Sequence, residues 1–146
     1  MGRLRRRSES RVRASTEEAA RVAATMDNYQ ANIRVLRNFA RAYNFKVIFF
    51  WQPSLASGNK PLTAFEEQFR SELQGSPQAN SLAMLKAVNE EAEGRSMQGG
   101  DFVFLGGIFD SVQEPVYIDH LMHLGPRGNQ IVARAIAQAM QDHASK

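Results

Sequence analysis

The stretch "FKVIFFWQP", residues 45–53, decides the fold class. Residues 47–51 form an unbroken run of apolar, β-favouring side chains, and Pro53 closes the run. Such a run is typical of a strand that is covered on both faces, as in a parallel sheet between layers of helices. We therefore expect residues 47–51 to form a buried strand of an α/β fold.

A long amphipathic helix is expected before this strand. The letters "STEE" read as a capping box, with Ser15 as the N-cap and Glu18 reaching back to it. Apolar side chains then recur at spacings of three and four, which places them on one face of a helix. This stripe consists of Ala19, Val22, Met26, Tyr29, Ile33, Leu36, Ala40 and Tyr43. Asn44 suits the left-handed position that ends such a helix.

The remaining elements follow from turn residues and apolar spacing. A second capping box, Thr63 with Glu66, predicts a helix that ends near Gly75, and another helix is expected over residues 81–93. Strands are expected at residues 102–105 and 115–118, and a last helix begins near Pro126. Strands that alternate with helices predict a layered α/β fold, in which ligands bind beyond the carboxyl ends of the strands.

Length and composition favour one domain with an unusual start. The chain has 146 residues, of which 43% are hydrophobic, and it contains no cysteine, which excludes disulfides and thiolate metal sites. Residues 2–13 carry six arginines and one glutamate, a net charge of +5, so the other residues carry −2 of the total of +3. We expect residues 1–14 to be a basic, disordered arm and residues 15–146 to form a partial α/β domain.

The basic arm and the N-terminus also bear on partners and location. A nucleic-acid or anionic-lipid contact is the alternative to a solvated arm, but the arm lacks the interleaved aromatics of base-stacking proteins, so nucleic acid is the weaker reading. No run of 18 apolar residues predicts a membrane span, and no apolar segment follows the basic start as in a signal peptide. The sequence leaves the compartment open.

The loop "YIDHLMHLGPRGN", residues 117–129, gathers groups suited to acid–base chemistry. His123 could act as a general base, and Asp119 could fix its tautomer from the other ring nitrogen. One alternative is a surface turn that caps the last helix. Another is a metal site built from Asp119, His120 and His123, but the only other histidine, His143, lies near the chain end, so no metal and no other cofactor is expected.

Residues 116–140, "VYIDHLMHLGPRGNQIVARAIAQAM", resemble the last conserved block of the SGNH (GDSL-type) hydrolases, and residues 32–55 are similar to the helix and strand that precede it. The resemblance covers roughly residues 27–140. It implies a three-layer α/β/α sandwich around a parallel sheet and a serine-dependent hydrolysis of carboxylic esters or acylated carbohydrates. By the same resemblance His123 is the catalytic base and Asp119 orients it, without a metal or organic cofactor.

Two departures from the family pattern leave activity open. The family places the acid three residues before the histidine, whereas Asp119 lies four before His123. No Gly-Asp-Ser nucleophile block is present, and the serines near strand ends read as ordinary loop residues; these are Ser54, Ser57, Ser81 and Ser111.

We therefore expect the His/Asp-bearing C-terminal part of an ester hydrolase, with an incomplete sheet and no activity on its own. Its partners would be a complementary N-terminal part or a second copy of the chain. The alternative is a non-catalytic α/β binding or interaction module derived from the same family.

Overall fold

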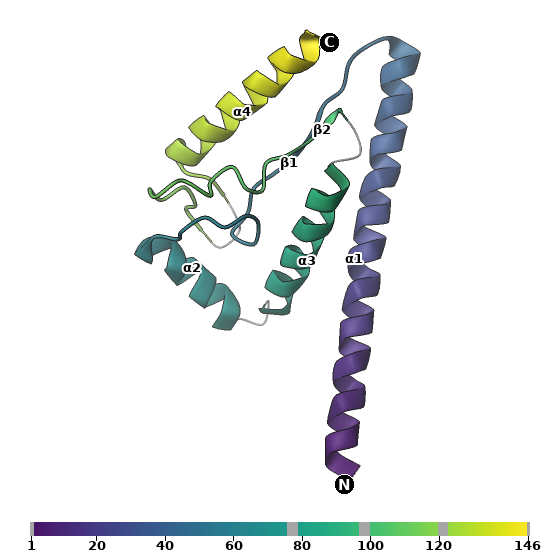
Figure 1. Ribbon diagram of the computed structural model, residues 1–146, viewed down its shortest axis with the longest axis vertical. Helices are drawn as coiled ribbons and strands as arrows, with labels where there is room; N and C mark the ends of the chain where they lie inside the picture. The colour runs from purple at the N-terminus through teal and green to yellow at the C-terminus, as the bar shows by residue number, and fades with distance from the viewer. Residues whose placement is uncertain (1, 76–78, 97–99, 120–122, 146) are drawn as a thin grey trace.

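The computed structural model describes residues 2–75, 79–96, 100–119 and 123–145. These residues form a mixed α/β structure that is mostly helical (Figure 1). In chain order its elements are α1 (Gly2–Tyr43), β1 (Phe49–Trp51), α2 (Ala64–Gly75), α3 (Ala79–Ser96), β2 (Phe102–Phe104) and α4 (Pro126–Ala144).

The described residues form one sheet, and it has two parallel strands. Phe49 pairs with Phe102 and Trp51 with Phe104, and backbone hydrogen bonds of 2.8 Å and 3.1 Å close the two ends of the ladder. Parallel pairing was expected for these two runs and is confirmed, although each strand is shorter than predicted. The prediction of a third strand at residues 115–118 was wrong, because Tyr117 makes only an isolated antiparallel bridge to Leu124.

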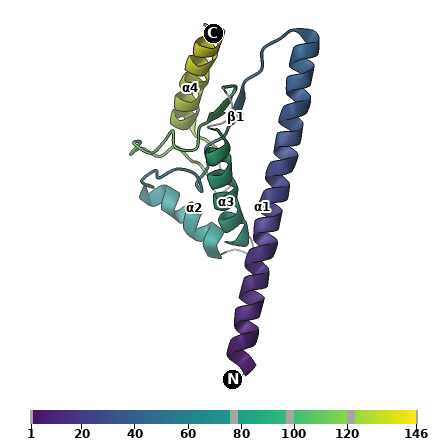
Figure 2. The same ribbon diagram turned by 45° about the vertical axis from the view of Figure 1, so that its right-hand side comes forward.

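Helices flank the sheet on two sides. Figures 1 and 2 show α4 on one side of β1 and β2, and α1 and α3 on the other. The expected larger sheet of a three-layer sandwich is not present in the described residues, since two short strands make up the whole sheet. Within the same residues, no helix combines the length and apolarity needed to cross a bilayer.

Helix α1 is longer than the sequence predicted. It begins at Gly2 rather than Ser15, so the arginine-rich segment is continuous with it and no break marks the expected boundary after residue 14. Its N-terminal end extends past the rest of the molecule (Figure 2). At the other end, Asn44 has a φ of 55° and Phe45 N–H donates to Ala40 C=O at 3.0 Å, which confirms the predicted left-handed helix end.

Half of the predicted stripe on α1 is covered by the rest of the protein. Val22 and Met26 pack with Val88 and Ala92 of α3, and Tyr29 stands edge-on to Trp51 with ring centroids 5.0 Å apart. Other members, Leu36 and Tyr43, are 46% and 72% exposed. The two-stranded sheet is too small to cover the full apolar face of a helix of this length.

An ion pair fastens α1 to the amino end of the sheet. Arg37 Nε donates to Asp101 Oδ2 at 2.7 Å, and the Asp101 carbonyl accepts the N–H of Phe49. The hydrogen bond from Arg37 lowers the pKa of Asp101 below its ordinary range, because it favours the charged carboxylate.

Candidate active site

The predicted catalytic residues lie together in the loop before α4. The Asp119 carboxylate contacts both the ring and the backbone of His123, with Oδ2 2.6 Å from Nδ1 and Oδ1 accepting the backbone N–H at 3.2 Å. The extra residue between acid and histidine therefore does not separate them. The third candidate of this loop, His120, lies outside the described residues.

A short antiparallel pairing explains how the longer loop still closes. Ile118 N–H donates to the His123 carbonyl at 3.0 Å, and Gly125 N–H donates to the Val116 carbonyl at 2.8 Å. These bonds flank the bridge between Tyr117 and Leu124. Because the pairing fixes both ends of the loop, Asp119 and His123 lie close enough for the Asp119 carboxylate to contact the His123 ring.

Residues after His123 hold the start of α4 against this pairing. Gly128 is buried, and a Cβ atom there would lie 2.9 Å from the Val116 carbonyl oxygen, so only glycine permits the close approach. The Asn129 side-chain amide donates to the Leu124 carbonyl at 3.0 Å. Gly128 and Asn129 thus hold α4 against the loop that carries His123, which we call the histidine loop; its described residues are 116–119 and 123–125.

His123 faces two hollows at the carboxyl end of β1. The first, of about 500 Å³, is also lined by Trp51, Pro53, Ser54 and Asn89. The second, also of about 500 Å³, lies towards α4, and His123 shares it with Phe50, Gln52, Leu105, Leu124, Asn129, Val132 and Ile136. The imidazole itself is 65% exposed, and it lines both hollows.

The serines near the site are occupied by structural hydrogen bonds. Ser54 is buried, and its Oγ accepts from Asn89 Nδ2 at 3.1 Å and from the backbone of Ala56 at 3.3 Å. Ser57 Oγ bonds the backbone of Ser54 and Gly106. In the part of the chain that the structure describes, no serine hydroxyl is hydrogen-bonded to His123.

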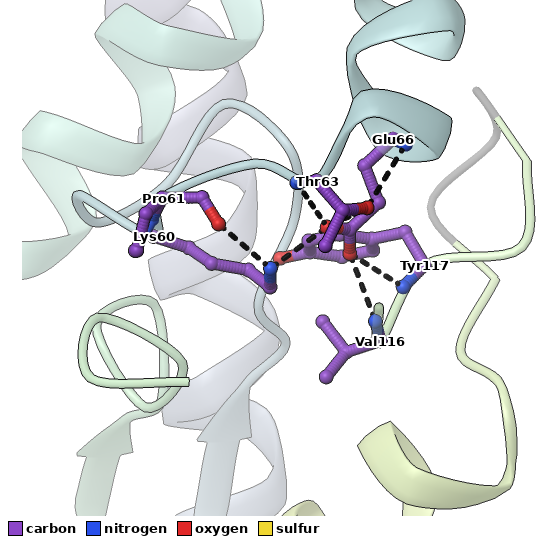
Figure 3. Close-up of polar contacts among 6 residues, drawn as sticks. All are labelled: Lys60, Pro61, Thr63, Glu66, Val116 and Tyr117. Carbon is purple, nitrogen blue, oxygen red and sulfur yellow. Dashed lines mark hydrogen bonds and ion pairs between the residues drawn. The ribbon is translucent and has the colours of Figure 1, made fainter. Parts of the chain in front are cut away.

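A fully buried carboxylate, Glu66, lies beneath the histidine loop (Figure 3). Glu66 Oε1 accepts the backbone N–H groups of Val116 at 2.8 Å and Tyr117 at 3.1 Å. Glu66 Oε2 accepts Lys60 Nζ at 2.7 Å and both the N–H and the hydroxyl of Thr63 at 3.0 Å. The predicted capping box is confirmed, because Glu66 N–H in turn donates to Thr63 Oγ1 at 3.3 Å.

The surroundings of Glu66 keep it ionised. Burial by itself raises the pKa of a carboxyl, but the hydrogen bonds from Lys60, Thr63, Val116 and Tyr117 outweigh it and lower the pKa of Glu66 to about 2. Burial, together with the carboxylates of Glu66 and Asp110, raises the pKa of the Tyr117 phenol. The sequence predicted that Glu66 caps α2. It did not predict the hydrogen bonds that Glu66 accepts from Val116 and Tyr117, which lie 50 and 51 residues further along the chain.

Other candidates from the sequence have structural surroundings. His143 lies in the last turn of α4, where its carbonyl accepts Lys46 Nζ at 3.2 Å. Among the described residues no group of three or more potential metal ligands of the histidine, cysteine, aspartate and glutamate types comes together. No protein-family model, no curated protein and no solved structure matches this chain.

Proposed function

We propose that this chain is the His/Asp-bearing part of an SGNH-type serine ester hydrolase, acting on carboxylic or O-acyl esters. The observation that carries the proposal is the 2.6 Å contact between Asp119 and the Nδ1 atom of His123 at the carboxyl end of a parallel sheet. An imidazole oriented in this way is suited to take a proton from a nucleophile on its other nitrogen.

The reaction divides into roles for this chain and for a partner. His123 removes the proton of a serine hydroxyl as it attacks the ester carbonyl, and then returns that proton to the departing alcohol, which leaves an acyl-serine. His123 next takes a proton from a water molecule that attacks the acyl-serine and gives it to the serine oxygen, which releases the carboxylic acid. Asp119 fixes the ring orientation and stabilises the imidazolium. Because the serines of the described site are held in structural hydrogen bonds, the nucleophile comes from a complementary segment or subunit that carries a Gly-Asp-Ser block.

The open sheet supports the need for such a partner. β1 and β2 are each edge strands, and large apolar side chains are exposed beside them on α1; these are Val35, Leu36, Phe39 and Tyr43. Unpaired strand edges favour pairing with another chain. A three-layer sandwich with a larger parallel sheet is completed, in this proposal, by strands of the partner.

Ester hydrolysis with and without the partner tests the proposal. The chain alone should cleave a para-nitrophenyl ester no faster than its His123→Ala variant, with His143→Ala as the matched histidine control. Together with the polypeptide encoded directly upstream, turnover should appear, and it should fall at least about 1,000-fold in His123→Ala and about as far in Asp119→Asn.

The results separate this proposal from its alternatives. Turnover by the complemented protein that is unchanged in His123→Ala would refute the assigned base. His123-dependent turnover by the chain alone, with a serine labelled by a fluorophosphonate, would refute the external nucleophile. A partner that binds equally well to the His123→Ala and Asp119→Asn variants, with no turnover in any of them, would favour the non-catalytic interaction module.

A further inference from the structure

Glu66 is the best-enclosed polar group of the described residues. Its side chain is 0% exposed, and that of its partner Lys60 is 3% exposed, yet the carboxylate belongs to α2 rather than to the histidine loop. Figure 3 shows the carboxylate between two parts of the chain, with Lys60 and Thr63 on one side and Val116 and Tyr117 on the other. Burying a charged carboxylate costs desolvation free energy, and an exposed glutamate can cap a helix equally well. Capping alone therefore does not account for a buried Glu66 with five donors.

The bonds of Glu66 continue directly into the histidine loop. Its Oε1 atom holds the N–H groups of Val116 and Tyr117. The carbonyl of Val116 receives the N–H of Gly125, and the next residue but one, Ile118, donates to the carbonyl of His123. One carboxylate oxygen therefore sets the position of the segment, residues 116–118, against which the backbone of His123 is paired.

We propose that Glu66 is a positioning residue for the His123–Asp119 pair, acting through the backbone of Val116 and Tyr117. Its meaning for catalysis rests on the proposed hydrolase function, whereas the placement of the loop does not. Without this acceptor, two buried N–H groups lose their partner, and the segment of residues 116–118 shifts away from its pairing. His123 then keeps its neighbours in sequence but loses its fixed orientation towards Asp119.

Hydrogen–deuterium exchange on the full chain tests the first link. With single-residue resolution, the amides of Val116 and Tyr117 should exchange at least about 100-fold more slowly than those of the exposed residues Gln113 and Glu114. Equal rates for these four amides in the unaltered protein would overturn the proposal, whatever any variant does.

The second link is tested on the His123 ring. In ¹⁵N-histidine-labelled protein, Asp119→Asn defines the Nδ1 signal of a broken pair. Glu66→Ala should move the His123 signal towards that reference, and Glu67→Gln, a change on the neighbouring residue that pairs with Arg70, should leave it unmoved. A folded Glu66→Ala protein with the unaltered His123 signal would overturn the proposal.

A double variant covers the case in which Glu66→Ala does not fold. Glu66→Gln combined with Lys60→Met keeps an oxygen for the two N–H groups and removes the buried cation. It should retain the His123 signal and the slow exchange, and loss of both in a folded protein would contradict positioning through the acceptor. If these results hold and complementation gives no ester hydrolysis, the loop anchor stands and only the hydrolase proposal falls.

Discussion

Acid should weaken this protein through Glu66 by an amount that the structure sets. The folded pKa of Glu66 is about 2, against an ordinary value of 4.5. Because the folded value is the lower one, the stabilisation is fully present above pH 4.5 and is lost as the pH falls towards 2. At 1.36 kcal/mol per pH unit the whole difference is about 3 kcal/mol, of which about 2 kcal/mol is lost by pH 3.

The matched comparison is with the double variant Glu66→Gln/Lys60→Met. It lacks the titrating carboxylate and leaves no unpaired buried charge, and replacing a buried ion pair by uncharged groups is often tolerated. Between pH 6 and pH 3 its free energy of unfolding should fall by about 2 kcal/mol less than that of the unaltered protein. The contribution of Asp101, whose pKa Arg37 also lowers, is the same in both proteins and cancels.

Urea unfolding followed by the fluorescence of Trp51 measures this difference. Trp51 is the single tryptophan; it is half-buried against the core, and its indole N–H donates to Asn89 Oδ1 at 2.8 Å, so its emission reports loss of the fold. Glu67→Gln provides the control for removal of a neighbouring glutamate. Parallel stability curves for the unaltered protein and the double variant from pH 6 to pH 3 would refute the reasoning.

Three further predictions concern the packing at Gly128, the hydrogen bond between Asn89 and Trp51, and the exposed apolar surface of α1. Gly128→Ala should lower the free energy of unfolding by about 1–3 kcal/mol, because its Cβ would lie 2.9 Å from a backbone oxygen. Gly94→Ala is the control: open space surrounds this position, so the substitution should raise the free energy of unfolding by about 0.5–1 kcal/mol. Urea unfolding measures both. Asn89→Leu should cost about 1–2 kcal/mol and shift tryptophan emission, because it removes the acceptor of the part-buried indole N–H of Trp51. The chain alone should self-associate in size-exclusion chromatography, because large apolar side chains are exposed on α1. Leu36→Lys combined with Phe39→Lys should shift the protein towards monomer. A stable monomer of the unaltered protein at every concentration would contradict this reasoning.

Local patterns in the sequence were accurate where the interaction is local. The capping box of Thr63 and Glu66 and the left-handed end at Asn44 depend on residues within a few positions, and both are confirmed. The predicted start of α1 was wrong: Ser15 lies inside the helix, so the letters STEE do not form an N-terminal capping box, and the arginine-rich segment continues the helix.

Predictions that depend on distant partners were less accurate. The segment at residues 115–118 has the composition of a strand, but its N–H groups at Val116 and Tyr117 bond to Glu66 instead of a neighbouring strand. The face of α1 that carries Leu36 and Tyr43 is apolar, but the sheet is too small to cover it. In both cases the outcome depends on what packs against the segment, which spacing alone does not contain.

The sequence by itself determined which residues could do acid–base chemistry, since Asp119 and His123 lie close together in one short motif, followed by Gly128 and Asn129, which hold α4 in place. It also determined the two parallel strands, because an unbroken apolar run has no polar face to expose. The strands are less covered than expected, since only Phe49 is buried and the other strand residues are half-buried. Only the tertiary structure decided whether Asp119 reaches His123 across one extra residue. The backbone pairing of Ile118 with His123 brings the two side chains within 2.6 Å. That pairing is held by Glu66, which is distant in the chain and reaches Val116 only in the folded protein, so local spacing could not predict it.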